Sequence, residues 1–307
     1  MESLLKWAIL NGATAGEDAP ASAPGEPPKK LDPEVIDAIL GKPASVQMTE
    51  CMDAVEHPET PLEAQEIALD DLEMLVENID NACNIEPLNL WPRIIALYTH
   101  SEPGVRSGAL WVSGTAVQHN PKAQSAFASH RGLHSALRVL EGDSVIGVRT
   151  KALYCVSSFI RGNVKGLTEF IASNGLPTLL MALEECRGAA ATAFRQKSFF
   201  LLRSLIEEAL DTATPEDLRP GMYLPNAIAE LGFVDTAASV MAQLAKDDPD
   251  GAAAAFEQVV GFLVVLGTTE NGKRAINACK ELASATSEAK SCFGQEFTKD
   301  LDQILVK

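Results

Sequence analysis

The chain lacks long apolar runs and contains few cysteines. Its longest uninterrupted apolar stretch, VVGFLVVL at 259–266, is far shorter than the about 20 residues that a transmembrane helix needs, so we expect no membrane span. The six cysteines lie far apart without a CxxC pair, which excludes a disulfide framework and predicts buried, reduced thiols. The opening MESLLKWAIL carries Glu2 and too short an apolar stretch for a secretory signal, so the cytosol is the expected location.

Positive charge is also scarce. Lysine and arginine together number 25 against 42 aspartate and glutamate residues, which gives a net charge of −17. So acidic a surface repels nucleic acid and anionic membranes, and we expect neither as a partner. Apolar residues make up 46% of the chain and suffice for a sizeable core. The composition therefore predicts a soluble protein that binds a partner protein of complementary charge, and we expect the chain to be a monomer.

The sequence motifs of enzymes are missing as well. No GxSxG nucleophile motif occurs, and no pair of carboxylates stands out as catalytic among the many acidic residues. The stretch GTTENGK at 267–273 resembles a phosphate-binding loop, but Arg274 stands where Ser or Thr is needed to ligate magnesium. An Asn-x-Lys pattern recurs at Asn120, Asn163 and Asn271, so we interpret the stretch as a mark of an internal repeat. We expect no catalytic residue and no cofactor, and we predict that the chain is not an enzyme.

Possible metal ligands do not form a usable pattern. The sequence DDPDG at 247–251 resembles part of a calcium loop, but Lys246 occupies the first ligand position and repels a cation. His130 and His134 have the spacing of zinc ligands on a helix, yet Gly132 lies between them and the Glu of an HExxH motif is absent. We therefore expect no metal site.

Strand signals are absent, and helix signals recur along the chain. The segment LDDLEMLVENI repeats apolar residues at three- and four-residue intervals, which predicts one helix face made of Leu69, Leu72, Leu75, Val76 and Ile79. Residues typical of helix ends are found at Asp32, Pro33 and Gly41, in a capping box at Thr60, Pro61 and Glu63, and in a similar start at Thr214, Pro215 and Asp217. The pattern predicts an all-α protein.

An internal repeat is the strongest structural signal. The segment that begins VRSGALWV at 105 matches the segment that begins VRTKALYC at 148, and each matching pair is 43 residues apart. The matched positions include Arg106 with Arg149, Ala109 with Ala152, Asn120 with Asn163, Lys122 with Lys165, Phe127 with Phe170, and Gly132-Leu133 with Gly175-Leu176. Armadillo and HEAT arrays repeat every 40–47 residues or so, with two or three helices in each unit.

The repeat predicts an armadillo-like right-handed superhelix, or α-solenoid, of about four repeats with helical caps. Third helices are expected after Arg106 and after Arg149, with weaker copies at 68–79, at 194–205 and in a last unit that opens at Gly232. The Gly-Leu pairs are expected to end one unit and to open the next. The third helices should line a concave surface, which is the usual binding face of such a scaffold.

Three regions are predicted along the chain. Residues 31–283 form the armadillo domain, and residues 284–307 form a C-terminal capping helix. Residues 1–30 comprise a short apolar peptide and a flexible linker, because 11–30 holds four Pro, three Gly and five Ala without a large apolar residue. The peptide either docks on the main body as a helix or acts as a recognition segment, and its apolar side chains are Leu4, Leu5, Trp7 and Ile9.

Two stretches carry a family resemblance. The opening MESLLKWAIL and the segment EIALDDLEMLVENIDNACNIEPLNLWPRIIAL at 66–97, followed by ALWVSGTAVQHNPKAQSAF, resemble the armadillo-type nucleotide exchange factors of the 70-kDa heat-shock chaperone. This family includes the human chaperone-binding protein and its fungal cytosolic counterparts. The likeness covers most of the chain and is most specific at 72–91, whereas an insertion at 207–223 and the last unit fit poorly.

The resemblance implies that the chain clasps one lobe of the chaperone's ATPase domain and favours its open state, so that ADP leaves. It also implies that Leu4, Leu5, Trp7 and Ile9 compete for the chaperone's peptide-binding groove and aid substrate release. The family pattern indicates partner contacts at Ala82, at the end of an inner helix, and at Lys197, facing carboxylates of the chaperone. The weaker candidates are Asn81, Glu77, Gln118 and Arg161, the last three at equivalent repeat positions.

A different armadillo adaptor or scaffold is the alternative function. Armadillo grooves that bind peptides usually carry a ladder of Trp and Asn on their third helices. Trp111 is present here, but we take Cys155 as the residue at the matching place, so no ladder is expected. The sequence therefore favours the exchange factor over the peptide-binding adaptor.

Overall fold

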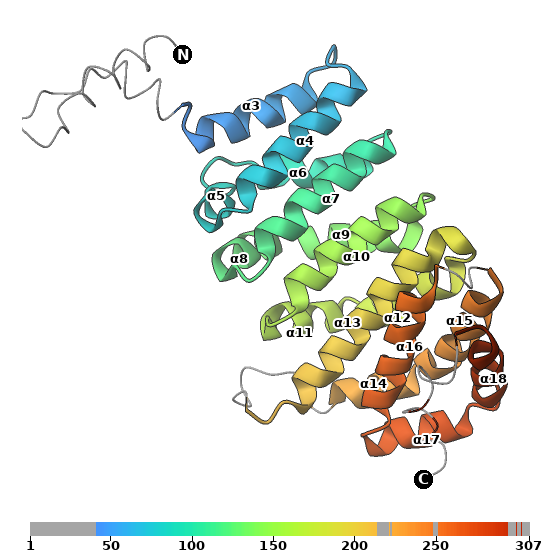
Figure 1. Cartoon of the computed structure of the whole chain (residues 1–307). Coiled ribbons are helices and arrows are strands. Elements are labelled where there is room, and N and C mark those ends of the chain that lie inside the picture. The colour runs from blue at the N-terminus through green and yellow to red at the C-terminus, as the bar shows by residue number, and fades with distance from the viewer. Residues whose placement is uncertain are drawn as a thin grey trace, which may run out of the picture.

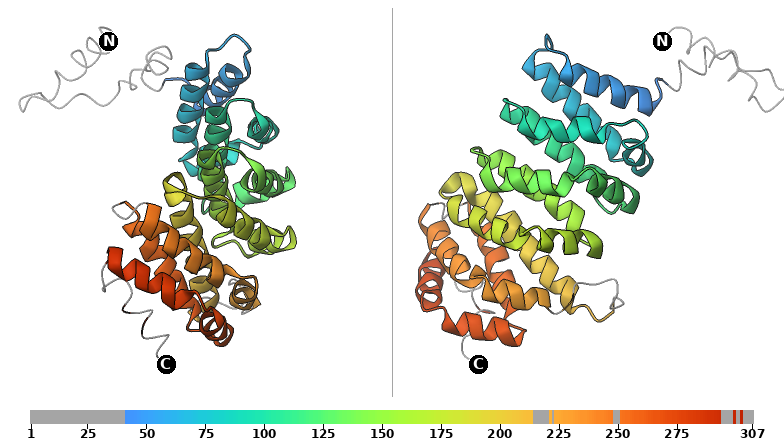
Figure 2. Two further views of the ribbon diagram at one scale, coloured as in Figure 1. Left: turned by 90° about the vertical axis from the view of Figure 1, so that its right-hand side faces the viewer. Right: turned by 180° about the vertical axis from the view of Figure 1, so that it is seen from behind.

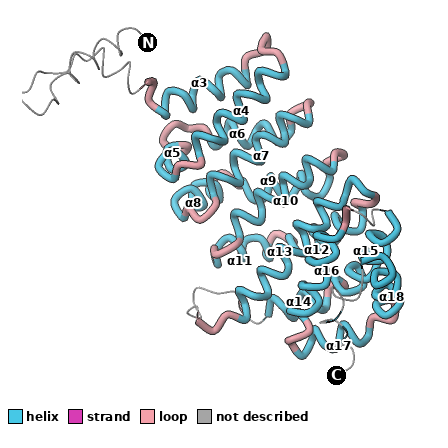
Figure 3. The backbone as a smooth tube through the Cα atoms, in the orientation of Figure 1, coloured by secondary structure: helices cyan, strands magenta, loops and turns pink. Residues whose placement is uncertain are grey.

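The computed structural model describes residues 41–213, 221, 223–247, 251–293, 299 and 302. Within these ranges every regular element is a helix, which confirms the predicted all-α class (Figure 3). The expected helix start at Asp32 and Pro33, the one at Thr214, Pro215 and Asp217, and the whole of the predicted N-terminal region 1–30 lie outside the described residues. Gly41 is described and has φ +69°, a conformation that glycine adopts without strain.

The helices follow one another with short connections (Figure 1). Their bounds are α3 (Ala44–Glu56), α4 (Leu62–Val76), α5 (Ile79–Asn84), α6 (Trp91–Ala96), the 3₁₀ helix η1 (Leu97–Thr99), α7 (Pro103–Val117), α8 (Pro121–Ser129), α9 (Gly132–Gly142), α10 (Ile146–Ile160), α11 (Val164–Ala172), α12 (Gly175–Glu185), η2 (Ala189–Ala191), α13 (Thr192–Leu210), α14 (Tyr223–Glu230), α15 (Phe233–Asp247), α16 (Ala253–Leu266), α17 (Glu270–Ala278) and α18 (Leu282–Phe293).

The helices pack in rows. The long helices α4, α7, α10, α13 and α16 contact one another in chain order and form a row of third helices. The second helices α9, α12, α15 and α18 form another row, and first helices meet in the pairs α5 with α8 and α14 with α17. Figure 2 shows the resulting stack from two further sides, with α3 at one end and α17 and α18 at the other. The predicted solenoid is thus confirmed.

Four complete three-helix units can be followed among the described helices. They are α5 to α7, α8 to α10, α11 to α13, and α14 to α16. The pair α3 and α4 precedes them, and α17 and α18 follow as the first and second helices of a further unit. Helix α18 begins two residues before the predicted start of the C-terminal cap at 284. The boundaries of the three predicted regions stay predictions.

The Gly-Leu pairs have a different place from the expected one. Gly132 and Gly175 begin the second helices α9 and α12, so they lie inside a unit and do not divide two units. A Cβ atom at Gly132 would come within 2.1 Å of the ring of Phe127, and one at Gly175 within 2.2 Å of the ring of Phe170. The glycine recurs because the preceding first helix packs its phenylalanine against the backbone at this point.

Helix ends also differ from the sequence prediction near residue 77. Helix α4 ends at Val76, so Ile79 is not on its buried face and is 64% exposed at the start of α5. Asn78 breaks the expected helix because its side chain accepts hydrogen bonds from the backbone N–H groups of Asp80 and Asn81 and caps α5. The capping box at Thr60 is wrong, since α4 begins at Leu62 with Pro61 as an N-cap that makes no side-chain bond.

The Asn-x-Lys pattern marks the repeat at two places and not at the third. Asn120 and Asn163 cap the first helices α8 and α11 by accepting from the backbone N–H groups of the residues three positions on. In the last copy this role belongs to Thr269, and Asn271 lies inside α17. The apolar run before it is helix α16 and not the strand that precedes a phosphate-binding loop.

The insertion expected at 207–223 is shorter than predicted. Helix α13 continues through Leu210, and α14 begins at Tyr223. Among the described helices none is long and apolar enough on its own to cross a membrane, whereas α14 and α15, bent by 59°, meet the length and composition together. Most apolar residues of that pair, including Leu224, Phe233 and Met241, are buried in the common core.

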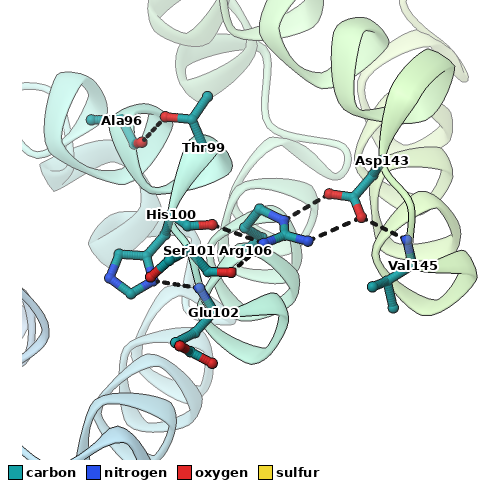
Figure 4. Close-up of polar contacts among 8 residues, drawn as sticks. All are labelled: Ala96, Thr99, His100, Ser101, Glu102, Arg106, Asp143 and Val145. Carbon is teal, nitrogen blue, oxygen red and sulfur yellow. Dashed lines mark hydrogen bonds and ion pairs between the residues drawn. The ribbon is translucent and has the colours of Figure 1, made fainter.

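Arginines at one repeat position join neighbouring units (Figure 4). In α7, the Nε and Nη2 atoms of Arg106 donate to the carboxylate of Asp143 at 2.7 and 3.1 Å, and Nη1 donates to the carbonyl oxygens of His100 and Ser101. The bidentate pair holds the third helix of one unit to the end of the second helix in the next unit.

The same link recurs one unit later. In α10, Arg149 donates to the carbonyl oxygens of Leu140 and Glu141 and forms an ion pair of 2.9 Å with Glu185 at the end of α12. In α13, Arg195 is fully buried and donates to the side-chain oxygen of Gln243. We call these three contacts the arginine links.

Candidate partner-binding surface

The candidate site is the third-helix face, which we define as the exposed and half-buried residues of α4, α7, α10 and α13 and of the one or two residues that follow each of these helices. A cavity of about 210 Å³ opens on this face between α7, α10 and α13. Its lining consists of Gln118, His119, Leu153, Tyr154, Ser157, Ser158, Arg161, Lys197 and Phe200. The fold thus brings three predicted contact residues, Gln118, Arg161 and Lys197, to one pocket.

The equivalent repeat positions are where the sequence indicated. Glu77, Gln118 and Arg161 are the C-cap residues of the third helices α4, α7 and α10. Gln118 and Arg161 line the pocket, while Glu77 is exposed at the end of α4. Their charges change from negative to neutral to positive along the face, so the two ends of this row suit different surfaces of a partner.

Ala82 and Asn81 do not lie on an inner helix. Both belong to the short first helix α5, and Ala82 is only 2% exposed because its methyl group packs in the core. The Nδ2 atom of Asn81 donates to the carbonyl oxygen of Leu75 at 2.9 Å and ties α5 to α4. The expected location was therefore wrong, and a role for these residues in binding remains a prediction. Leu4, Leu5, Trp7 and Ile9 lie outside the described residues.

Hydrogen bonds link the third helices across this face. The Thr115 hydroxyl donates to the Glu73 carboxylate at 2.6 Å and lies 3.2 Å from the Tyr154 hydroxyl. The Tyr154 hydroxyl in turn donates to Oε1 of Gln118 at 3.5 Å. The contacts run from α4 through α7 to α10, so they fix how these helices sit beside one another.

An aromatic ladder is present that the sequence interpretation missed. The true 43-residue match of Trp111 is Tyr154 and not Cys155, and Phe200 holds the same position in α13. Cys155 instead points into the core, where burial raises the pKa of its thiol to about 12. Trp111 and Tyr154 are half-buried and Phe200 is 43% exposed, so all three rings reach the third-helix face. A shift of one residue in the comparison concealed the ladder.

A cation lies against each ring of this ladder. Lys151 Nζ is 3.3 Å from the ring centroid of Trp111, and Lys197 Nζ is 6.0 Å from that of Tyr154. The guanidinium carbon of Arg161 is 5.2 Å from the centroid of Phe200. Cations over aromatic faces are attracted by the ring quadrupole, by about 0.5–1 kcal/mol at exposed sites. The rings therefore hold three positive charges on one face of a strongly acidic protein.

Neighbouring charges affect two of these cations. Burial is the main cause that lowers the pKa of Lys151, and the nearby charge of Lys197 lowers it further. The carboxylates of Glu73 and Asp70 raise this pKa. Arg161 faces Glu208 at 3.6 Å between Nε and Oε1.

The histidine pair fails as a metal site in the described structure. His130 Nε2 lies 2.9 Å from a carboxylate oxygen of Glu86, and His134 is exposed in the next helix beyond Gly132. The part of the chain that the structure describes contains no group of three or more His, Cys, Asp or Glu residues placed to hold a metal ion.

The fold defines the class of an armadillo-type solenoid, and the third-helix face is its candidate binding surface. The family model described as nucleotide exchange factor Fes1 matches residues 1–85, and the model of the SIL1/FES1/HPBP1 C-terminal domain matches residues 81–220. The two models describe one family, that of the nucleotide exchange factor Fes1 and its relatives, and together they match residues 1–220 of this chain. The resemblance found in the sequence is confirmed.

Curated relatives carry matching names. The Hsp70 nucleotide exchange factor fes1 of Schizosaccharomyces pombe is 50% identical over 106 residues, which cover 34% of this chain and 37% of that protein. The Hsp70 nucleotide exchange factor FES1 of Kluyveromyces lactis is 39% identical over 134 residues, covering 43% of this chain and 44% of that protein. The matched part spans less than half the length of either relative.

Solved structures show the likeness in fold alone. A designed armadillo repeat protein in complex with the peptide (KR)4 has a TM-score of 0.62 at 12% identity, covering 84% of this chain and 98% of the designed chain. A second set of computationally designed armadillo repeat proteins for modular peptide recognition has a TM-score of 0.58 at 12% identity, with the same coverage.

Proposed function

We propose that this chain is a nucleotide exchange factor that binds the ATPase domain of a cytosolic 70-kDa heat-shock chaperone and promotes ADP release. The observation that carries the proposal is the convergence of Gln118, Arg161 and Lys197 in one pocket of the third-helix face. These residues come from two separate repeats and one weaker copy, and the fold gathers them where a partner can reach. The names of the relatives support the same partner class.

The exchange activity follows from a difference in affinity between two states of the chaperone. A rigid face that fits the open ATPase domain better than the closed one shifts the chaperone toward the open state. By linkage, ADP then binds less tightly by the same factor. In this mechanism the chain makes and breaks no covalent bond, needs no cofactor or metal, and is not an enzyme. It acts as a monomer in the cytosol, without nucleic acid or membrane as partners.

Stopped-flow release of a fluorescent ADP from the purified chaperone tests the proposal. Micromolar concentrations of the full chain should accelerate release, and the chain alone should hydrolyse no ATP. Lys197→Ala should raise the concentration that gives half of the maximal acceleration, because it removes an exposed ammonium group whose only contact reported for the described structure is the Tyr154 ring at 6.0 Å. An unchanged release rate at saturating concentrations of the wild-type chain would refute the proposed function.

The N-terminal segment is proposed to aid release of substrate from the chaperone's peptide-binding domain. Leu4, Leu5, Trp7 and Ile9 suit a groove that accepts apolar, extended peptides. Deletion of residues 1–30 should leave ADP release unchanged and slow the release of a labelled chaperone-bound peptide. If the truncated chain releases the peptide as fast as the full chain, the segment has no such role.

A peptide-binding adaptor remains the second candidate, and the aromatic ladder is the observation that favours it. The designed armadillo repeat protein in complex with (KR)4 shares this fold and holds a basic peptide. In the present chain, Lys151 and Lys197 already lie against Trp111 and Tyr154. A basic peptide would meet like charges at these rings, so anisotropy with labelled (KR)4 should detect no binding, whereas tight binding would favour the adaptor.

A further inference from the structure

The pair α3 and α4 begins the stack, and among the described helices no first helix precedes it. Helix α3 continues the row of second helices, because Arg93 of α6 forms ion pairs of 2.7 Å with Asp53 and Glu56 of α3. Helix α4 opens the row of third helices. The first helices α5, α8 and α11 lie along one side of the stack, which is also the side at which α3 begins (Figure 1). The next place in their row, beside the start of α3, is that of a further first helix.

The backbone before α3 has the turn that follows a first helix elsewhere in the molecule. In each of the four complete units, one residue between the first and the second helix has a left-handed conformation, with φ between +54° and +96°. These residues are Asn89, Arg131, Asn174 and Gly232. Gly41, just before α3, has φ +69°. A residue in this conformation commonly ends a helix, so the turn at Gly41 fits a helix that comes before it.

An open groove lies beside this turn, between α3 and α4. Its volume is about 810 Å³, almost four times that of the pocket between α7, α10 and α13. Gly41 itself lines the groove, together with Cys51 and Ala54 of α3 and with Met74 and Leu75 of α4. The lining is mainly apolar, and the groove has room for a row of side chains.

Exposed apolar side chains are concentrated at this end of the stack. Five of the ten large apolar side chains that are exposed in the described part of the chain belong to α3, α4 and α5, and they are Val46, Leu62, Ile67, Met74 and Ile79. Met74, in the groove, is 68% exposed. Grouped apolar side chains on a surface mark a place where another segment packs.

The segment LDPEVIDAIL at 31–40, which lies outside the described residues, has the sequence that such a place requires. It directly precedes Gly41, so its concentration at the groove exceeds that of any free peptide. A helix from Pro33 to Leu40 would have eight residues, and the described first helices have six to nine. Its apolar residues follow the spacing of one helix face, and they are Val35, Ile36, Ile39 and Leu40.

We propose that the groove between α3 and α4 is the docking site of residues 31–40 of the same chain, which pack there as the first helix of the unit that α3 and α4 complete. The inference does not depend on the proposed function. It bears on the two alternatives for the peptide at 1–10, which either docks on the main body or acts as a recognition segment. A groove filled by residues 31–40 is closed to this peptide, which favours the recognition role.

Alkylation of Cys51 measures whether the groove is covered. N-ethylmaleimide is added to the full chain, and the labelling of each cysteine is followed by mass spectrometry of its peptide. Ile36→Asp and Ile39→Asp should each speed the labelling of Cys51 about tenfold, because a charge on the apolar face opposes docking. The half-buried Cys83 does not line the groove, so its labelling should stay unchanged. Ile9→Asp is the control, and faster labelling of Cys51 in this variant alone would assign the groove to residues 1–10 and overturn the proposal.

Hydrogen exchange tests the same contact from the side of the groove. The backbone amides of residues 35–40 should be protected in the wild-type full chain, and Met74→Asp should raise their exchange rates about tenfold. Ile67→Asp is the matched control, because Ile67 is exposed on the same helix and does not line the groove.

Two results of these measurements would overturn the proposal. Amides of residues 35–40 that exchange in the wild-type chain as fast as in an unfolded peptide would show that the segment does not dock. Protection of Cys51 that increases with protein concentration would assign the groove to a second copy of the chain.

Discussion

The arginines that join the units and the lysines of the third-helix face occupy recurring positions on the same helices, yet they have opposite surroundings. Arg106 and Arg149 are largely buried, and each donates to carbonyl groups of its own unit and to a carboxylate of the next unit. Lys151 and Lys197 contact rings and lack counter-ions in the described part of the chain. A repeat can therefore carry two sets of cations with separate roles, one that stabilises the stack and one that faces a partner.

Loss of a buried arginine link should have the largest effect. In Arg106→Met, the carboxylate of Asp143, whose side chain is 8% exposed, loses a bidentate partner, so the free energy of unfolding should fall by about 3 kcal/mol. Urea denaturation followed by circular dichroism measures this change. The double variant Arg106→Met/Asp143→Leu should recover most of the loss, because no unpaired buried charge remains. If the free energy of unfolding of Arg106→Met falls by less than about 1 kcal/mol, the arginine links contribute no more to stability than the exposed lysines do.

Salt should weaken partner binding through Lys151 and Lys197 and should change little the stability that the arginine links provide. Charges exposed to solvent are screened within about 8 Å at physiological ionic strength, whereas buried pairs are screened much less. Raising NaCl from 50 to 500 mM should therefore increase the half-saturating concentration for ADP release roughly fivefold. The urea midpoint measured at the same two salt concentrations should change little. Equal salt sensitivity of binding and stability would contradict the comparison.

Removing Lys151 should affect stability only slightly. Lys151→Met retains the apolar stem over Trp111 and removes the cation, which is worth about 0.5–1 kcal/mol at an exposed aromatic face. The free energy of unfolding should thus fall by no more than about 1 kcal/mol, and relief of the repulsion from Lys197 reduces this further. The comparison with Arg106→Met in one urea series is the measurement. A loss as large as that of Arg106→Met would make Lys151 a structural residue.

The pH dependence is the smallest expected effect and the most specific. Burial and the charge of Lys197 lower the pKa of Lys151, so this ammonium loses its proton below the ordinary lysine pKa of about 10.4. Binding that uses its charge should weaken as the pH rises from neutral towards the ordinary lysine pKa. The half-saturating concentration of the wild-type chain should rise more over this range than that of Lys151→Arg, whose guanidinium stays charged. Parallel pH profiles for the two proteins would argue against a contact at Lys151.

The solenoid could be predicted from the sequence because many matching residue pairs show the same 43-residue period. Arg106 with Arg149 and Phe127 with Phe170 establish the period without knowledge of any single contact. The ends of helices were harder to predict where a polar side chain caps a new helix within a continuing apolar pattern. Asn78 caps α5 and ends the helix that the spacing of Leu72 and Ile79 predicted to continue.

The candidate site was only partly predictable for a different reason. Gln118 and Arg161 could be related by the repeat, but their meeting with Lys197 in one pocket depends on how α7, α10 and α13 stack. The ladder of rings was concealed by a one-residue error, since the neighbours Tyr154 and Cys155 point in different directions from α10, Tyr154 towards the half-buried face and Cys155 into the core. Ala82 shows the reverse case, in which a residue indicated by resemblance proves to be buried.

The arginine links also predict how the junctions between units would resist a force that pulls the two ends of the stack apart. Each link spans only one junction between adjacent units, so a pull on the two ends of the stack is resisted junction by junction. At the junction between α13 and α15 the buried Arg195 donates to an uncharged glutamine where the earlier junctions offer a carboxylate. Of the three arginine links, this one joins no opposite charges, so tension should separate its two helices more readily than the helices joined by Arg106 or Arg149.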